Sequence, residues 1–204
     1  MTGPTGDNQL KTFSHYSLGT QKITEKALVE RAKTDSAAFG ILYDIYLGQI
    51  YGFILKRVGN VAVAEDITSL TFEKALRKLK DFHWQNVSFG AWLYTIAANA
   101  VTDHFRENVR KQKVDLDSVP EIKDGRQSLE AEVSQKIFFE NVRNLLPSLD
   151  EPDQTVLTLK LFSEKSNQEI CQVVGLSKAH VAVRIHRALK KLRQELRERG
   201  IDYY

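Results

Sequence analysis

The sequence predicts an all-α protein made of two small helical domains joined by a flexible acidic linker. Apolar residues recur at helical spacing along most of the chain, and no stretch shows a convincing strand-like alternation. Only 4 prolines and 11 glycines interrupt the 204 residues. The composition shifts once, between residues 113 and 134, where six acidic residues oppose three basic ones. A hydrophobic share of 42% allows a chain of this length to form a packed core.

The first two predicted helices follow an N-terminal tail, residues 1–23, which is rich in small polar residues and is expected to be disordered. The first helix runs from about Glu25 to Lys33. The second runs from Ser36 to Val58, with Asp35 as its N-cap and Gly59 as its stop signal.

Two more helices complete the predicted first domain, residues 24–112. Asn60 caps a third helix that reaches about Lys80, and Ser88 caps a fourth after the polar break at residues 81–87. The third helix is expected to turn six residues toward the core: Ala64, Ile67, Phe72, Ala75, Leu76 and Leu79. The acidic linker, residues 113–134, then separates this domain from a second one, residues 135–204.

The cysteine content and the apolar runs indicate a cytoplasmic protein. A single cysteine allows no intrachain disulfide and no zinc cluster, so we expect a reducing compartment and no metal or other cofactor. The N-terminal tail lacks the apolar centre of a signal peptide, and no later run is expected to approach the roughly 20 apolar residues of a membrane span. We therefore expect no membrane insertion.

Residues 167–192 of the second domain read as a helix-turn-helix. Cys171 provides the small residue where two helices cross, Gly175 permits the tight turn, and Val181 anchors the second helix. The net charge of the chain is only +3, yet residues 174–200 hold eight basic and two acidic residues. A solvated basic face would explain that charge alone, but the spacing of small residue, glycine and valine favours binding to DNA.

The first domain indicates which kind of helix-turn-helix protein this is. Its main motif is Trp92-Leu93-x-x-Ile96-Ala97-x-Asn99-x-x-x-Asp103-x-x-Arg106, preceded by Ala64-Glu65-Asp66-Ile67 and Phe72-x-x-Ala75-Leu76. With the terminal motif His186-Arg187-Ala188-Leu189-Lys190-Lys191-Leu192-Arg193, it resembles the extracytoplasmic-function (ECF) sigma factors of bacterial RNA polymerase. The resemblance covers residues 25–200.

The resemblance implies a promoter-specificity subunit with no catalytic site, which is therefore not an enzyme. Its expected partners are the RNA polymerase core, promoter DNA and an anti-sigma factor of the kind that holds many family members inactive. The first domain would bind the polymerase clamp and open the −10 element by capturing a flipped base, and the second would read the −35 element. The acidic linker would thread the polymerase channels, although a merely flexible tether explains its composition equally well.

The resemblance also assigns residues to these roles. The residues expected to bind the core polymerase are Glu65, Asp66, Glu73 and Lys74. Those expected at the −10 element are Phe82, His83, Trp84, Gln85, Asn86, Asn99, Asp103, Arg106 and Arg110. Those expected at the −35 element are Ser177, Lys178, His180, Arg184, Arg187 and Lys191.

Several of these assignments have a structural alternative. The charges of the third helix could form a solvated face, and Trp84 could equally be a core plug. Ala98 and Ala182 stand where the family often has basic residues, so fewer phosphate contacts are expected. Two other functions compete. A stand-alone helix-turn-helix regulator would bind duplex DNA without polymerase, whereas an enzyme is disfavoured because no phosphate loop or nucleophile elbow is found.

Overall fold

The computed structural model describes residues 24–84, 87–112 and 140–200. The predicted tail (1–23) and linker (113–134) lie outside the described residues, as do Gln85 and Asn86 of the −10 set. All the regular structure in the described ranges is helical, which confirms the predicted fold class.

Four helices form the N-terminal half: α2 (Glu25–Ala32), α3 (Ser36–Val58), α4 (Val61–Lys78) and α5 (Phe89–Gln112). The predicted caps are confirmed. The side chain of Asp35 accepts a hydrogen bond from the N–H of Ala37, and that of Asn60 accepts one from Val63. Gly59 ends α3 with φ of 68°, a left-handed conformation that glycine adopts without strain. A 3₁₀ turn, η1 (Leu79–Asp81), extends α4 to the predicted polar break.

The core of this half lies between α3, α4 and α5. Leu42, Phe53 and Ile54 of α3 are almost fully buried, and the ring of Phe53 meets the edge of Tyr94 on α5 with centroids 5.4 Å apart. The prediction that Leu76 faces inward is wrong, because its side chain is 50% exposed on the outer side of α4.

Helix α3 also corrects the expectation about apolar runs. By length and composition it could cross a membrane, and it is the one helix of the described ranges that meets this test. In the structure α3 packs against α2, α4 and α5, and its buried residues include the charged Arg57. A core helix of a soluble protein has the same length and composition.

The C-terminal half begins with helical residues 140–145 and a 3₁₀ turn, η2 (Leu146–Ser148). Helix α7 (Glu151–Leu157) runs into a π-helical turn, η3 (Thr158–Phe162). Helices α8 (Asn167–Val174) and α9 (Lys178–Glu198) form the helix-turn-helix. Gly175 adopts φ of 67° between them, and Ser177 caps α9, both as predicted.

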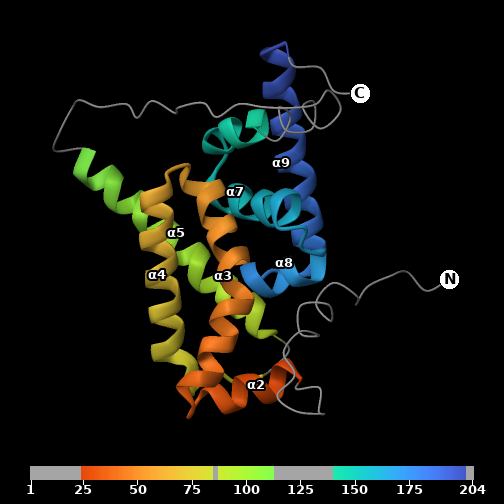
Figure 1. Cartoon of the computed structure of the whole chain (residues 1–204). Coiled ribbons are helices and arrows are strands. Elements are labelled where there is room, and N and C mark those ends of the chain that lie inside the picture. The colour runs from red at the N-terminus through yellow and green to blue at the C-terminus, as the bar shows by residue number, and fades with distance from the viewer. Residues whose placement is uncertain (1–23, 85–86, 113–139, 201–204) are drawn as a thin grey trace, which may run out of the picture.

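The two halves pack directly against each other. Figure 1 shows α7, α8 and α9 along one side of the N-terminal bundle, with α8 against α5 and η3 against α3. Val156, Leu159, Ile170 and Val173 of the C-terminal half belong to the same buried cluster as the residues of α3 and α5. The sequence did not predict this arrangement, which forms an extended contact between the two halves.

Candidate nucleic-acid interface

An aromatic corner lies where α4 ends and α5 begins, and we define it as Phe82, Trp84, Phe89 and Trp92. The ring of Phe82 lies 4.8 Å from Trp92, 5.9 Å from Phe89 and 6.0 Å from Trp84, measured between centroids. Phe82 and Phe89 are buried, whereas Trp84 is half-buried and its neighbour His83 is exposed. Phe82 therefore supports the corner from inside, and Trp84 combines core packing with an accessible face.

Three residues brace this corner from below. The hydroxyl of Tyr46 donates a hydrogen bond to the carboxylate of Glu25, and the ring of Tyr46 contacts Phe89 edge-on. Burial raises the pKa of Glu25, while hydrogen bonds from Tyr46 and from the backbone of Gly90 oppose that rise. A Cβ atom at Gly90 would lie 2.9 Å from Cε1 of Tyr46, so only glycine fits here without a shift.

A polar stripe runs along α5 from the aromatic corner, formed by Asn99, Asp103, Arg106 and Arg110. All four residues are exposed, at the spacings of four, three and four predicted for one helix face. The carboxylate of Asp103 lies 4.0 Å from Nζ of Lys74 on α4, which links one predicted −10 residue to one predicted core-binding residue.

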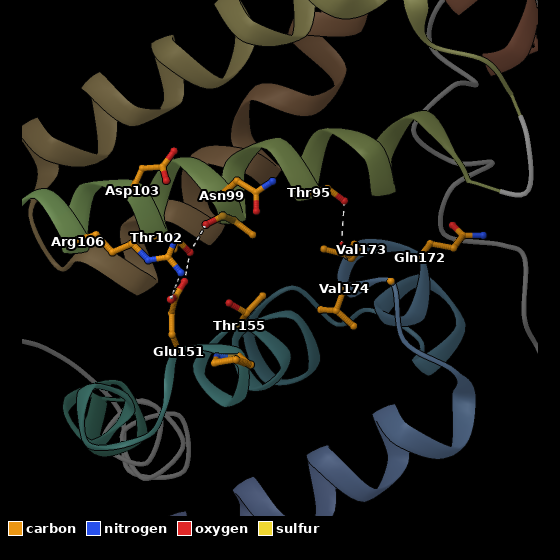
Figure 2. Close-up of a pocket in the computed structure, with 13 residues that line it drawn as sticks. Thr95, Asn99, Thr102, Asp103, Arg106, Glu151, Thr155, Gln172, Val173 and Val174 are labelled. Carbon is orange, nitrogen blue, oxygen red and sulfur yellow. Dashed lines mark hydrogen bonds and ion pairs between the residues drawn. The ribbon is translucent and has the colours of Figure 1, made fainter.

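Three residues of the stripe, Asn99, Asp103 and Arg106, line one wall of a cleft of about 750 Å³ between the two halves of the protein. Thr95, Ala98 and Thr102 complete this wall. The other wall comes from α7 and α8, with Glu151, Thr155, Gln172 and Val174 among its residues. Figure 2 shows Arg106, Thr102 and Glu151 meeting across the cleft. Sequence reasoning missed Thr102 and Glu151, because they lie on opposite sides of the linker.

The predicted −35 residues lie on α9, but they differ in their surroundings. Lys178 and Arg187 are exposed. Ser177 caps the helix, and its hydroxyl lies 2.9 Å from Nδ1 of the exposed His180. Ser177 and His180 therefore contribute to capping α9, independently of their predicted contact with the −35 element.

Arg184 and Lys191 face acidic residues at the start of α7. Nη1 of Arg184 lies 2.9 Å from the carboxylate of Asp153, whose side chain is buried, and Nζ of Lys191 lies 3.8 Å from Asp150. Burial raises the pKa of Asp153, the adjacent Asp150 raises it further, and Arg184 lowers it. Arg184 thus neutralises a buried acid within its own domain.

Val183 is an exposed residue of α9 that sequence reasoning did not single out. Its side chain is 49% exposed, beside the basic residues of the outward face. A helix-wheel plot places it near the centre of that face, because it lies one turn before Arg187. An exposed apolar group at this place suits contact with the methyl group of thymine.

The outer face of α4 combines charged and apolar groups. The predicted core-binding residues Glu65, Asp66 and Glu73 are exposed, and Lys74 is half-buried. Three large apolar side chains share the surface of this helix and are also exposed: Val61, Leu70 and Leu76. Sequence reasoning missed these, although exposed apolar groups among charges are typical of a protein-binding surface.

No group of three or more histidine, cysteine and acidic side chains in the described ranges could hold a metal ion. The free Cys171 is half-buried in the first helix of the helix-turn-helix and packs against the shared core. The described site is therefore built from amides, charges and aromatic rings.

Comparison with known proteins identifies the family. The model of Sigma-70 region 2 matches residues 42–111, and that of Sigma-70, region 4 matches residues 139–192. The chain is 36% identical to the ECF RNA polymerase sigma factor BldN of Streptomyces coelicolor over 166 residues, which is 81% of this chain and 63% of BldN. It is 30% identical to the RNA polymerase sigma factor YlaC of Bacillus subtilis, over 76% of this chain and 90% of YlaC.

Solved structures show the same fold. The sigma factor RpoE of Bartonella quintana, in complex with the anti-sigma factor NepR, matches with a TM-score of 0.60 and 21% identity. That match covers 78% of this chain and 96% of the solved one. The order of the four helices, the helix-turn-helix and the two family matches thus agree, and the chain belongs to the ECF family of RNA polymerase sigma factors.

Proposed function

We propose that this sigma factor joins the RNA polymerase core in the cytoplasm, presents α5 and the aromatic corner to the −10 element, and presents α9 to the −35 element. It catalyses no reaction itself, because nucleotide addition belongs to the polymerase. The observation that carries the proposal is that one helix, α5, holds Trp92 of the aromatic corner near its start and the polar stripe from Asn99 onward. Binding of a single DNA strand requires an aromatic side chain that can stack on a base, together with amide and basic groups that can contact the backbone.

Strand opening would begin at the aromatic corner. The exposed face of Trp84 can stack on an unpaired base, and such stacking contributes about 1–3 kcal/mol per base. Phe82, which packs on Phe89, would hold the Trp84 ring in place before DNA arrives and so lower the entropic cost of capture. Asn99 and Arg106 would follow the backbone of the same strand, while Asp103 would orient its neighbours.

Recognition of the −35 element would use the outward face of α9 in the major groove. Lys178 and Arg187 can contact phosphates or guanine edges, and Val183 can contact a thymine methyl group. The pairing of Arg184 with Asp153 leaves it a supporting role at the edge of this face. Duplex affinity of the isolated protein would be low, because Arg184 and Lys191 are paired with acids and Ala182 stands where the family often has a basic residue.

The outer face of α4 would dock on the polymerase clamp, with Asp66 and Glu65 as charged contacts and Leu70 as an apolar one. An anti-sigma factor is a further proposed partner, since RpoE of Bartonella quintana was solved with one.

Run-off transcription tests the proposal. Genomic-fragment templates are transcribed by bacterial core polymerase with and without the protein, in competition with a housekeeping sigma factor. New discrete start sites that need the protein are the expected result. Absence of initiation, together with specific duplex binding by the protein alone, would instead indicate a stand-alone regulator. The Asp66→Ala variant should initiate less because it binds the core more weakly, while its affinity for duplex DNA stays unchanged.

A further inference from the structure

Part of the polar stripe that is proposed to hold the −10 strand faces the C-terminal half of the same chain across the cleft, although its four side chains stay exposed. The hydroxyl of Thr102 donates a hydrogen bond to the carboxylate of Glu151, and Nη2 of Arg106 lies 4.0 Å from the same carboxylate. About two turns closer to the aromatic corner, the hydroxyl of Thr95 donates a hydrogen bond to the backbone carbonyl of Val173 over 3.0 Å. Figure 2 shows these three contacts joining the two walls of the cleft.

Glu151 contacts side chains of the kinds that commonly bind DNA phosphates. Arginine, threonine and asparagine side chains are the usual donors to phosphate oxygens, and the carboxylate of Glu151 accepts from one threonine and pairs with one arginine. Glu151 is the second residue of an acidic segment, Asp150, Glu151 and Asp153, at the start of α7. The other two acids pair with Lys191 and Arg184 inside the C-terminal half, so Glu151 is the one of these three acids that pairs across the cleft.

Contacts on both sides of Glu151 extend the interface. Oε1 of Gln172 lies 3.4 Å from the hydroxyl of Ser88, the residue that caps α5 next to the aromatic corner. The aliphatic side chains of Leu159 and Ile170 are fully buried against the N-terminal half. Burial of this apolar surface stabilises the closed arrangement without any other protein.

One buried group opposes closure. Arg57 on α3 is buried, with only 6% of its surface exposed. Its Nη1 donates a hydrogen bond to the hydroxyl of Thr155 over 2.6 Å. Its Nε and Nη2 have no hydrogen-bond partner among the described residues. Burial lowers the pKa of Arg57 to about 10. Separation of the halves would return Nε and Nη2 of Arg57 to water. This gain in hydration lowers the free energy cost of opening.

We propose that the chain inhibits itself: Glu151 occupies the −10 strand's place on α5 and holds the two halves closed, and promoter DNA must displace it. The inference rests on the proposed function, because it takes the polar stripe to be the DNA site. Closed and open forms then differ in whether Thr102 and Arg106 bind Glu151 or a phosphate. The buried Arg57 favours the open form and Glu151 the closed one.

The first test compares two variants that lose the same charge. Glu151→Gln removes the carboxylate that crosses the cleft, and Asp150→Asn removes its neighbour, which pairs only within the C-terminal half. The probe is a fluorescein-labelled oligothymidylate of about 20 nucleotides, and its anisotropy is measured with the full chain at low salt. We expect Glu151→Gln to bind about threefold or more tightly than Asp150→Asn, since a larger share of molecules is competent.

The second test measures closure without DNA. Spin labels at Ala27→Cys on α2 and Arg193→Cys on α9, in a Cys171→Ser background, report the distance between the halves. With Glu151 intact, we expect one narrow distribution of the distance between the two labels. With Glu151→Gln, we expect a longer and broader distribution. Asp150→Asn should keep the narrow distribution, and Arg57→Met should sharpen it.

Two outcomes would overturn the inference: equal oligothymidylate affinity of Glu151→Gln and Asp150→Asn, or a broad distribution in the protein with Glu151 intact. Run-off transcription separates this failure from failure of the proposed function. If the protein initiates at discrete promoters but neither readout responds to Glu151→Gln, the sigma factor role stands and self-inhibition is wrong. If no variant initiates, the proposed function itself is wrong.

Discussion

Gly90 offers the sharpest test of how the aromatic corner is built. Adding a Cβ there places a carbon 2.9 Å from Cε1 and 3.1 Å from the hydroxyl of Tyr46. The ring of Tyr46 must move, and its hydroxyl then pulls away from the carboxylate of Glu25. Gly48 is the matched control, because it also lies within a helix but a Cβ there would meet nothing within 4 Å.

The expected effects have opposite signs. Overpacking at Gly90 costs about 1–3 kcal/mol, and a weakened charge-assisted hydrogen bond costs up to about 1–2 kcal/mol more. The helical preference of alanine over glycine returns about 0.5–1 kcal/mol. Gly90→Ala should therefore lower the free energy of unfolding by about 1–4 kcal/mol, where the range reflects the partial overlap of the two costs. Gly48→Ala should raise it by about 0.5–1 kcal/mol.

Urea unfolding of both variants measures this difference. Circular dichroism follows the helices, and fluorescence follows the aromatic corner, since both tryptophans of the chain lie there. With core polymerase, Gly90→Ala should also reduce the permanganate reactivity of −10 thymines, because the ring that braces the corner has shifted. A Gly90→Ala protein as stable as Gly48→Ala would refute the reasoning.

Three further predictions test other parts of the site. Arg184→Ala should destabilise the protein by about 1–3 kcal/mol, because it leaves the buried Asp153 unpaired, whereas Arg187→Ala should stay within about 0.5 kcal/mol in the same urea titration. Burial raises the pKa of Glu25 above its ordinary 4.5, so the folded state holds that proton more tightly than the unfolded state. The resulting contribution to stability is fully present below the pKa of Glu25 in the unfolded state, and it is lost as the pH rises through the pKa of Glu25 in the folded state. Urea titrations at several pH values should show this pH-dependent stability in the native protein and not in Glu25→Gln. Replacement of the −35 thymines by deoxyuridine removes their methyl groups and should weaken promoter binding by the native holoenzyme. The same replacement should weaken binding by the Val183→Ala holoenzyme less. An equal effect on both holoenzymes would show that Val183 does not contact the thymine methyl group.

Local signals in the sequence predicted the helices well. Capping residues act within one turn, so Asp35, Asn60 and Ser177 marked the true starts of their helices. Leu76 was misplaced because it lies beside Phe72 and Ala75 on the helical wheel, and only the angle of the neighbouring helix decides which of them is covered. That angle depends on tertiary packing.

The site was predicted only where one helix carries it. The spacing along α5 brought Asn99, Asp103 and Arg106 to one face, as the structure shows. The pairing of Thr102 with Glu151 joins residues 49 positions apart, and no local pattern signals it. Asp153, the acid that engages Arg184, lies 31 positions away and was missed for the same reason. Contacts between the halves depend on how the halves dock, which the sequence pattern does not encode locally.

The shared apolar cluster has a consequence for folding. Val156 and Val173 are buried against α3 and α5, whereas Leu145, Leu192 and Leu196 form a separate cluster among the C-terminal helices. Because the first cluster spans both halves, heat or urea should melt them in one cooperative transition while they are closed. In the proposed open form, each half would expose part of this core to water and would depend on the polymerase for the missing support. The stability of that form would then be a property of the transcription complex and not of the sigma factor alone.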